Sequence, residues 1–161
     1  MQNAAVIGAG AAGLVCADRL AAAGVEVVVF EKSRGIGGRL ATRRRGDFAF
    51  DHGAPYFDVS SASTRALVDR LRAEDAATEW GDDRWIGLPG MSGLLKPIAR
   101  NLDVRPQKRV AELARETHGW RIAFEDGETT EEFDGVAVAI PAPQATTLVA
   151  PFGLDDPIDR A

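Results

Sequence analysis

Three closely spaced glycines, Gly8, Gly10 and Gly13, and an acidic residue further along the chain, Glu31, are residue types well suited to binding a phosphate-containing ligand. In a Gly-x-Gly-x-x-Gly turn the first glycine permits a tight bend, the second lets the backbone approach a pyrophosphate, and the third allows close packing of helix and strand. An acidic residue at the end of the next strand can accept hydrogen bonds from the hydroxyls of an adenosine ribose. The pattern therefore predicts a site for an adenine dinucleotide. The predicted contacts are Gly8, Gly10, Ala11, Ala12, Gly13, Glu31 and Lys32.

The elements around this turn agree with that interpretation. Residues 4–7 and 25–30 are short apolar runs typical of parallel strands buried on both faces, and residues 14–23 form a helical pattern between them. The start of that helix presents free N–H groups and the positive end of its dipole to phosphates. This combination of elements argues against a purely structural glycine turn.

The remaining pattern predicts an α/β fold with a Rossmann-like parallel sheet. Residues 136–140 form another continuous apolar run and are expected to return to that sheet. Before them, residues 109–115, 120–124 and 131–133 predict a three-stranded antiparallel meander with turns at 118–119 and 126–127. The other predicted elements are a short strand over 47–50, a helix over 63–73, a helix over 93–100 with Ser92 as its N-cap, and an irregular connection over 151–157.

Composition excludes several classes of protein. The 161 residues, 45% of them hydrophobic, can support one globular domain with a core. A net charge of −5 argues against nucleic-acid binding, although Arg43, Arg44 and Arg45 form a local basic run. Long apolar runs are absent, so no membrane partner is predicted. The single cysteine, Cys16, fits a reducing, cytoplasmic location.

No side chain can be assigned as catalytic from the sequence. Neither a metal-ligand spacing nor a catalytic triad is present, so no metal is predicted and the chemistry is expected to come from a cofactor. Arg39 could offer a bidentate fork to a pyrophosphate, and Arg34 is an equally open candidate. His52 is interpreted as structural in preference to a proton relay, because no partner is evident. Trp85 and Tyr56 suit a protein core better than a substrate wall.

Four further segments carry a resemblance to a known family. These are Gly37-Gly38-Arg39, Asp51-His52-Gly53-Ala54 with Tyr56-Phe57, residues 85–92 (Trp-Ile-Gly-Leu-Pro-Gly-Met-Ser) and residues 140–145 (Ile-Pro-Ala-Pro-Gln-Ala). With the first glycine turn, they resemble the flavin-dependent amine oxidase superfamily and, more specifically, its bacterial renalase-like branch. The resemblance covers nearly the whole chain.

The resemblance implies that the cofactor is FAD. Gly8, Gly10 and Gly13 would line the pyrophosphate site, and Glu31 would hold the ribose. By the same analogy Gly37, Gly38 and Arg39 lie near the phosphates, Gly53, Ala54 and Tyr56 lie near the isoalloxazine, and the backbone of Val110 binds adenine. Pro55 departs from the glutamine of many relatives and removes a backbone donor. The implied small-molecule substrate is a reduced nicotinamide isomer or an amine, with oxygen as electron acceptor.

Similarity also sets the expected domain organisation. Residues 1–161 correspond to the N-terminal part of an FAD/NAD(P)-binding domain, in which about 58–100 is a helical segment facing the substrate side. Related enzymes continue into a substrate domain that this chain lacks, so the chain alone is expected to be inactive and a partner chain or self-association could complete it. Two alternatives stay open: an NAD(P)-binding dehydrogenase and a non-catalytic nucleotide-binding module.

Overall fold

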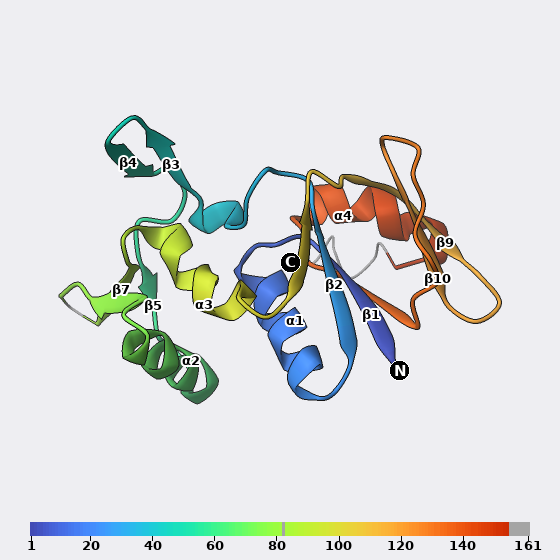
Figure 1. Cartoon of the computed structure of the whole chain (residues 1–161). Coiled ribbons are helices and arrows are strands. Elements are labelled where there is room, and N and C mark those ends of the chain that lie inside the picture. The colour runs from blue at the N-terminus through green and yellow to red at the C-terminus, as the bar shows by residue number, and fades with distance from the viewer. Residues whose placement is uncertain (82, 155–161) are drawn as a thin grey trace. The chain divides into compact units, whose positions relative to one another are not determined.

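The computed structural model describes residues 1–81 and 83–154, and the chain divides into two compact units (Figure 1). Unit 1 is formed by Met1–Gly35 and Leu102–Ala161, and unit 2 by Ile36–Asn101. The chain therefore leaves unit 1 after its second strand and returns to it for the next one. No helix in the described part of the chain is long and apolar enough to cross a membrane.

Unit 1 is built on a four-stranded parallel sheet. Its strand order is β11 (Gly135–Val138), β1 (Asn3–Ile7), β2 (Glu26–Glu31) and β8 (Asp103–Pro106). The register pairs Ile7 with Val138 on one side and with Phe30 on the other. The three strands predicted from continuous apolar runs are confirmed as parallel neighbours, whereas β8 was not predicted to join them.

Two layers cover the sheet of unit 1. Helix α1 (Ala11–Ala22) buries Leu14 and Ala17 completely, and in Figure 1 it lies on the opposite side of β1 and β2 from the hairpin of β9 and β10. The other layer shares a buried cluster with Ile7 and Phe30, and the Phe30 ring meets Phe124 edge-on at 5.0 Å. Because successive side chains of a strand point to opposite faces, the sheet is apolar on both sides.

The second layer contains an antiparallel hairpin and a helix. Strands β9 (Val110–Arg115) and β10 (Trp120–Phe124) pair with a bulge between Ala123 and Phe124. The predicted third strand over 131–133 is reduced to an isolated bridge from Phe133 to β10, and a second bridge to β10 comes from Thr129, which precedes the predicted strand. Helix α4 (Ala142–Val149) and the 3₁₀ turn η3 (Ala150–Phe152) follow β11. This turn covers the start of the predicted connection over 151–157, of which residues 155–157 lie outside the described residues.

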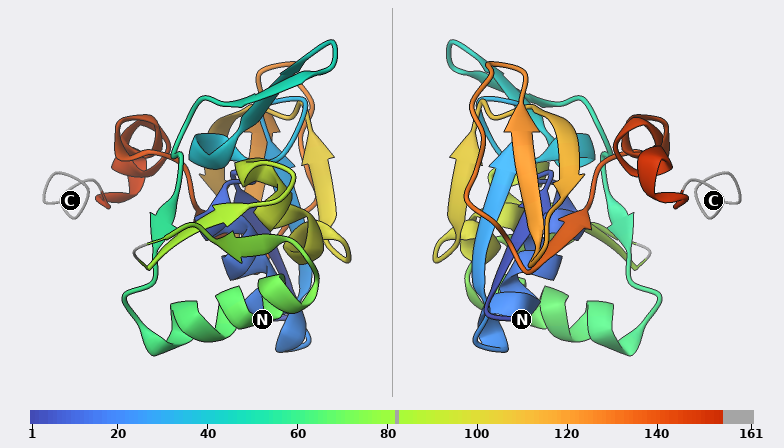
Figure 2. Two further views of the ribbon diagram at one scale, coloured as in Figure 1. Left: turned by 90° about the vertical axis from the view of Figure 1, so that its left-hand side faces the viewer. Right: turned by 90° about the vertical axis from the view of Figure 1, so that its right-hand side faces the viewer.

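Unit 2 combines short strands and helices (Figure 2). Its strands are β3 (Thr42–Arg45) and β4 (Phe48–Asp51) in one hairpin, and β5 (Phe57–Asp58), β7 (Arg84–Gly87) and β6 (Ala77–Glu79) in a three-stranded sheet. Its helices are η1 (Gly38–Leu40), α2 (Ala62–Ala73), η2 (Met91–Leu95) and α3 (Lys96–Ala99). The range 58–100 is therefore not only helical, because β6 and β7 run through it.

The two helices predicted in unit 2 differ in outcome. Helix α2 begins as predicted to within one residue, and the Ser61 hydroxyl caps it by accepting a hydrogen bond from the Thr64 N–H at 3.1 Å. The predicted helix over 93–100 is instead split into η2 and α3. Ser92 was wrongly predicted as an N-cap, since it lies inside η2, where its N–H bonds to the Thr42 hydroxyl.

Candidate functional site

The glycine turn of unit 1 has no room for side chains at two of its positions. Gly8 has a φ of +105°, and a Cβ there would lie 2.8 Å from the carbonyl oxygen of Ala139. At Gly13 a Cβ would lie 1.9 Å from the carbonyl oxygen of Gly8. Both distances are far inside van der Waals contact, so the turn holds its shape only with glycine at these two positions.

Helix α1 starts directly from this turn. Gly10 is its N-cap and offers no side chain to the first-turn N–H groups, and no acidic side chain lies in that turn. The N–H groups of Ala11 and Ala12 therefore retain their capacity to bind an anion, which the helix dipole favours. These are the amides that the sequence predicted would face a pyrophosphate.

Glu31 ends β2 and is only 6% exposed; it is the one charged or polar residue classed as buried among the described residues. Its carboxylate accepts hydrogen bonds from the N–H of Ala9 at 2.8 Å and from the N–H of Ser33 at 2.7 Å. A carboxylate has about four acceptor positions, so two more bonds are available to a ligand. The predicted ribose acceptor thus also fastens the glycine turn to the end of β2, a bond that the sequence did not reveal.

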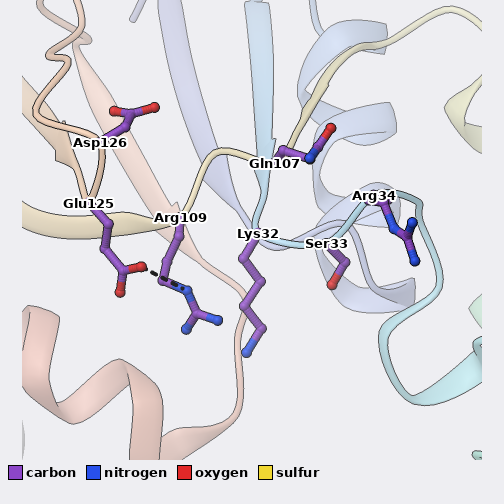
Figure 3. Close-up of a pocket in the computed structure, with 7 residues that line it drawn as sticks. All are labelled: Lys32, Ser33, Arg34, Gln107, Arg109, Glu125 and Asp126. Carbon is purple, nitrogen blue, oxygen red and sulfur yellow. Dashed lines mark ion pairs between the residues drawn. The ribbon is translucent and has the colours of Figure 1, made fainter.

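A pocket of about 600 Å³ lies in unit 1 beside this strand end (Figure 3). Its walls come from the residues after β2, from the β8–β9 connection and from the turn after β10. Two backbone hydrogen bonds join the first two segments, from Lys108 N to Glu31 O and from Gln107 N to Ser33 O. The lining residues are Lys32, Ser33, Arg34, Gln107, Arg109, Glu125 and Asp126.

Of these residues the sequence predicted only Lys32 and left Arg34 open. Lys32 donates to the Gln144 side chain at 2.8 Å, which links the pocket wall to α4. Val110, predicted to bind adenine through its backbone, directly follows Arg109 and pairs with Phe124. The other lining residues were missed because they come from segments distant in sequence. Gln107 has a positive φ of +59° and so forms a turn. The sequence did not predict this turn, because glycine and asparagine are the residues typical of such a φ and neither is present there.

Ion pairs organise the hairpin side of this pocket. Arg109 Nε lies 3.2 Å from Glu125 Oε2, and Lys108 Nζ lies 2.8 Å from Asp126 Oδ2. Lys108 also bonds to Glu128 at 2.5 Å. Hydrogen bonds to Asp126 and then to Glu128 raise the pKa of Lys108, and the bond from Lys108 is the main reason that the pKa of Asp126 is lowered.

The other predicted site residues lie in unit 2, where two of the predicted segments meet. Gly37 and Gly38 have φ values of +139° and +54°. The N–H of Ala54 donates to the carbonyl oxygen of Arg39 at 2.8 Å, and a Cβ on Gly53 would lie 1.9 Å from that same oxygen. The Gly-Gly-Arg segment and the Asp-His-Gly-Ala segment are therefore packed backbone to backbone.

The neighbours of these segments are also defined. One oxygen of Asp51 accepts from the Thr42 hydroxyl at 2.5 Å and from the Met91 N–H at 3.0 Å, which ties the second segment to η2. The Arg84 guanidinium lies over the Tyr56 ring, with its Cζ 4.7 Å from the ring centre of Tyr56. Trp85 is 4% exposed, as expected for a core residue.

Comparisons with known proteins agree with this architecture. Residues 6–71 match the profile of an NAD(P)-binding Rossmann-like domain, and residues 77–161, more than half of the chain, match that of flavin containing amine oxidoreductase. A 4,4'-diapophytoene desaturase of Staphylococcus aureus (strain Newman) is 49% identical over 74 residues, which are 42% of this chain and 15% of that protein. The chain thus spans a small part of this curated relative.

Solved structures show the same fold. An oxidoreductase from Methanosarcina mazei has a TM-score of 0.65 at 15% identity, covering 92% of this chain and 61% of its own. The tetracycline destructase Tet(51) has a TM-score of 0.68 at 17% identity, covering 92% and 41%. The profile match over residues 77–161 shows that the chain belongs to the flavin-containing amine oxidoreductase family.

Proposed function

We propose that this chain is the nucleotide-binding part of an FAD-dependent oxidoreductase of the renalase-like branch. The buried carboxylate of Glu31 beside the glycine turn is the observation that carries the proposal. The turn fits a pyrophosphate, because Gly8 and Gly13 leave no space for side chains and the start of α1 has no side-chain cap. FAD is the dinucleotide of the family to which the chain belongs.

Each part of the site then has a role. The N–H groups of Ala11 and Ala12 bind the phosphates, and the remaining acceptor positions of Glu31 bind the ribose hydroxyls. The pocket beyond Glu31 holds the adenine, next to the backbone of Val110. In unit 2, Gly37, Gly38 and Arg39 serve the phosphates while Gly53, Ala54 and Tyr56 serve the isoalloxazine. The hydrogen bond between Ala54 and Arg39 supports a joint role for these two segments.

Such a site needs no nucleophile of its own. When bound, a flavin takes up a hydride, here from a reduced nicotinamide isomer or an amine, and passes the electrons to oxygen, giving hydrogen peroxide. The protein's own contribution is to hold the dinucleotide, orient its ring and limit the access of water. Reduced NAD(P) is a proposed substrate of this site.

One specific observation favours a second candidate. Residues 6–71 match the profile of an NAD(P)-binding Rossmann-like domain. A dehydrogenase that binds NAD directly would use the same turn and the same carboxylate. The 2′-phosphate of NADP would meet the Glu31 carboxylate, so this candidate prefers NAD.

We also propose that the active assembly needs further polypeptide, from a partner chain, self-association or additional sequence. Strand β4 supports this, because Phe48 is 69% exposed and Phe50 is 57% exposed, with their rings stacked at 6.2 Å. Exposed aromatic pairs are typical of surfaces that another segment covers. No nucleic-acid or membrane partner is proposed, and the single cysteine supports a cytoplasmic location.

A panel of nucleotide cofactors tests the proposal. FAD, FMN, NAD and NADP are titrated into the 161-residue chain, followed by stopped-flow mixing of the FAD sample with reduced nicotinamides. We expect weak binding that favours FAD over FMN, and no flavin reduction faster than that of free flavin. Preference for NAD would support the dehydrogenase, and rapid saturable bleaching would show that this chain alone is a complete catalyst.

A further inference from the structure

The carboxylates that line the pocket beside Glu31 differ in how many hydrogen-bond acceptor positions they have free. Asp126 and Glu125 are the two carboxylates in its wall. Both oxygens of Asp126 are engaged: Oδ2 accepts from Lys108 at 2.8 Å and Oδ1 from the Glu128 N–H at 3.0 Å. Gln107 carries an amide that both donates and accepts, so it does not discriminate between ligands. Glu125 is therefore the carboxylate in this wall with more acceptor positions left for a ligand, since only its Oε2 has a partner, Arg109.

Glu125 is held in place by Arg109. Its N–H donates to the Arg109 carbonyl oxygen at 3.0 Å, and its Oε2 lies 3.2 Å from Arg109 Nε. Within the described part of the chain, no hydrogen bond is recorded for Oε1 of this carboxylate. In Figure 3 the side chains of Glu125, Arg109 and Lys32 extend in the same direction from the backbone. The paired guanidinium also offers a flat face on which a base can stack.

The register of the hairpin brings this carboxylate next to the predicted adenine position. Val110 pairs with Phe124, so the pair formed by Arg109 and Glu125 is the next one along the two strands. We propose that Glu125 accepts a hydrogen bond from the exocyclic amine of adenine and makes this pocket selective for adenine over guanine nucleotides. The inference rests on the proposed dinucleotide function and adds the residue that reads the base.

The preference for adenine over guanine follows from the groups that the two bases carry. Adenine has an amino group at position 6, where guanine has a carbonyl oxygen, so a carboxylate that faces position 6 accepts from the first base and repels the second. Guanine's own donors, its N1–H and 2-amino group, attract a carboxylate, so the proposed preference applies to a base whose position 6 faces Glu125. The Glu125 side chain is 64% exposed. Water competes at such a position, so we expect a preference of about tenfold and not the several thousandfold of a buried site.

The test compares ADP with GDP by isothermal titration calorimetry on four versions of the full chain: the original, Glu125→Gln, Glu128→Gln and Glu31→Gln. We expect the original chain to bind ADP about tenfold more tightly than GDP. In Glu125→Gln the amide can donate to the guanine oxygen, so the ratio of the two affinities should fall to near one. Glu128→Gln is the matched control, because Glu128 lies in the same turn and bonds to Lys108 but does not line the pocket. It should keep the preference.

The outcomes separate this inference from the proposed function. An unchanged ADP preference in Glu125→Gln, together with ADP binding that Glu31→Gln weakens, overturns the role of Glu125 and leaves the dinucleotide site intact. Failure of the original chain to bind either nucleotide at millimolar concentration overturns both. Equal loss of ADP preference in Glu125→Gln and Glu128→Gln also overturns the inference, since a general change in hairpin charge would then explain the effect.

Discussion

The Glu31 carboxylate accepts a hydrogen bond from the backbone N–H of Ala9 at 2.8 Å, inside the core of unit 1. This bond joins the end of β2 to the turn that follows β1. It fixes the orientation of the turn before any ligand arrives, while Ser33 fixes the other carboxylate oxygen. One side chain therefore shapes the predicted phosphate site and supplies the predicted ribose acceptor.

Replacing Glu31 with glutamine should impair both roles. The amide loses the charge, and its NH₂ group cannot accept from Ala9 or Ser33, so one buried N–H is left without a partner. We expect a loss of about 1–3 kcal/mol in the free energy of unfolding. FAD affinity should fall by about one to two orders of magnitude. Urea denaturation and flavin fluorescence measure the two effects.

The matched control for this substitution is Glu26→Gln. Glu26 is exposed at the other end of the same strand, so its substitution should change neither stability nor FAD affinity appreciably. Equal FAD affinity in the original chain and Glu31→Gln would contradict the assignment of the ribose acceptor.

The closest approach in the glycine turn gives a second prediction. A methyl group at Gly13 would lie 1.9 Å from the Gly8 carbonyl oxygen, so Gly13→Ala must displace α1 or the turn. We expect a destabilisation of about 2–4 kcal/mol, measured by thermal unfolding. Gly35→Ala is the control, because nothing lies within 4 Å of its added methyl group. Similar stability of the two variants would show that the turn is more pliable than its geometry indicates.

A third prediction concerns unit 2. Gly53→Ala would place a methyl group 1.9 Å from the Arg39 carbonyl oxygen, which also accepts the Ala54 N–H. The two segments must then separate, and the Ala54 amide should lose its protection against hydrogen exchange. Exchange measured by NMR checks this amide against those of α2, which should stay protected. Full protection at Ala54 in the variant would refute the backbone contact.

The ion pairs of the β9–β10 hairpin predict a small pH dependence. The pKa of Asp126 is lowered by its bond from Lys108, so its stabilisation is present above its unfolded pKa and is lost as pH falls through the lower folded value. The pKa of Lys108 is raised, so its share is lost only as pH rises through that raised value.

Asp126→Asn should therefore flatten the acid side of the stability curve. The effect is small, because Asp126 is about half exposed and solvent screens the pair. Melting temperatures of both proteins, followed from about pH 7 down to pH 2, should converge at the acid end. A constant difference over that whole range would contradict the role of this ion pair.

The sequence allowed prediction of the features that depend on local composition. Residues 4–7, 25–30 and 136–140 are apolar and β-branched, so their place in a buried parallel sheet follows from their own chemistry. β8 escaped prediction because Asp103–Pro106 is largely polar, as suits an edge strand, and its pairing with β2 depends on the chain returning from unit 2.

In the candidate site, too, the residues close together in sequence could be predicted and those brought together by strand pairing could not. Gly8, Gly13 and Glu31 lie within one supersecondary unit, so their spacing in the sequence is enough to predict a dinucleotide site. Gln107, Arg109 and Glu125 come to the pocket only through the pairing of β2 with β8 and of β9 with β10, which residue types alone do not specify. The predicted strand over 131–133 kept only one bridge to β10, from Phe133 to Trp120, because the acidic residues around it favour solvent.

The most direct test of the central claim is a map of backbone amide chemical shifts as FAD is added to the 15N-labelled chain. The account predicts progressive shifts of the Ala9, Ala11, Ala12 and Ser33 amides, which surround the Glu31 carboxylate and the start of α1. It also predicts that the same amides shift much less in Glu31→Gln at an equal, subsaturating FAD concentration. Shifts that leave these four amides unchanged and gather elsewhere in the chain would contradict the account.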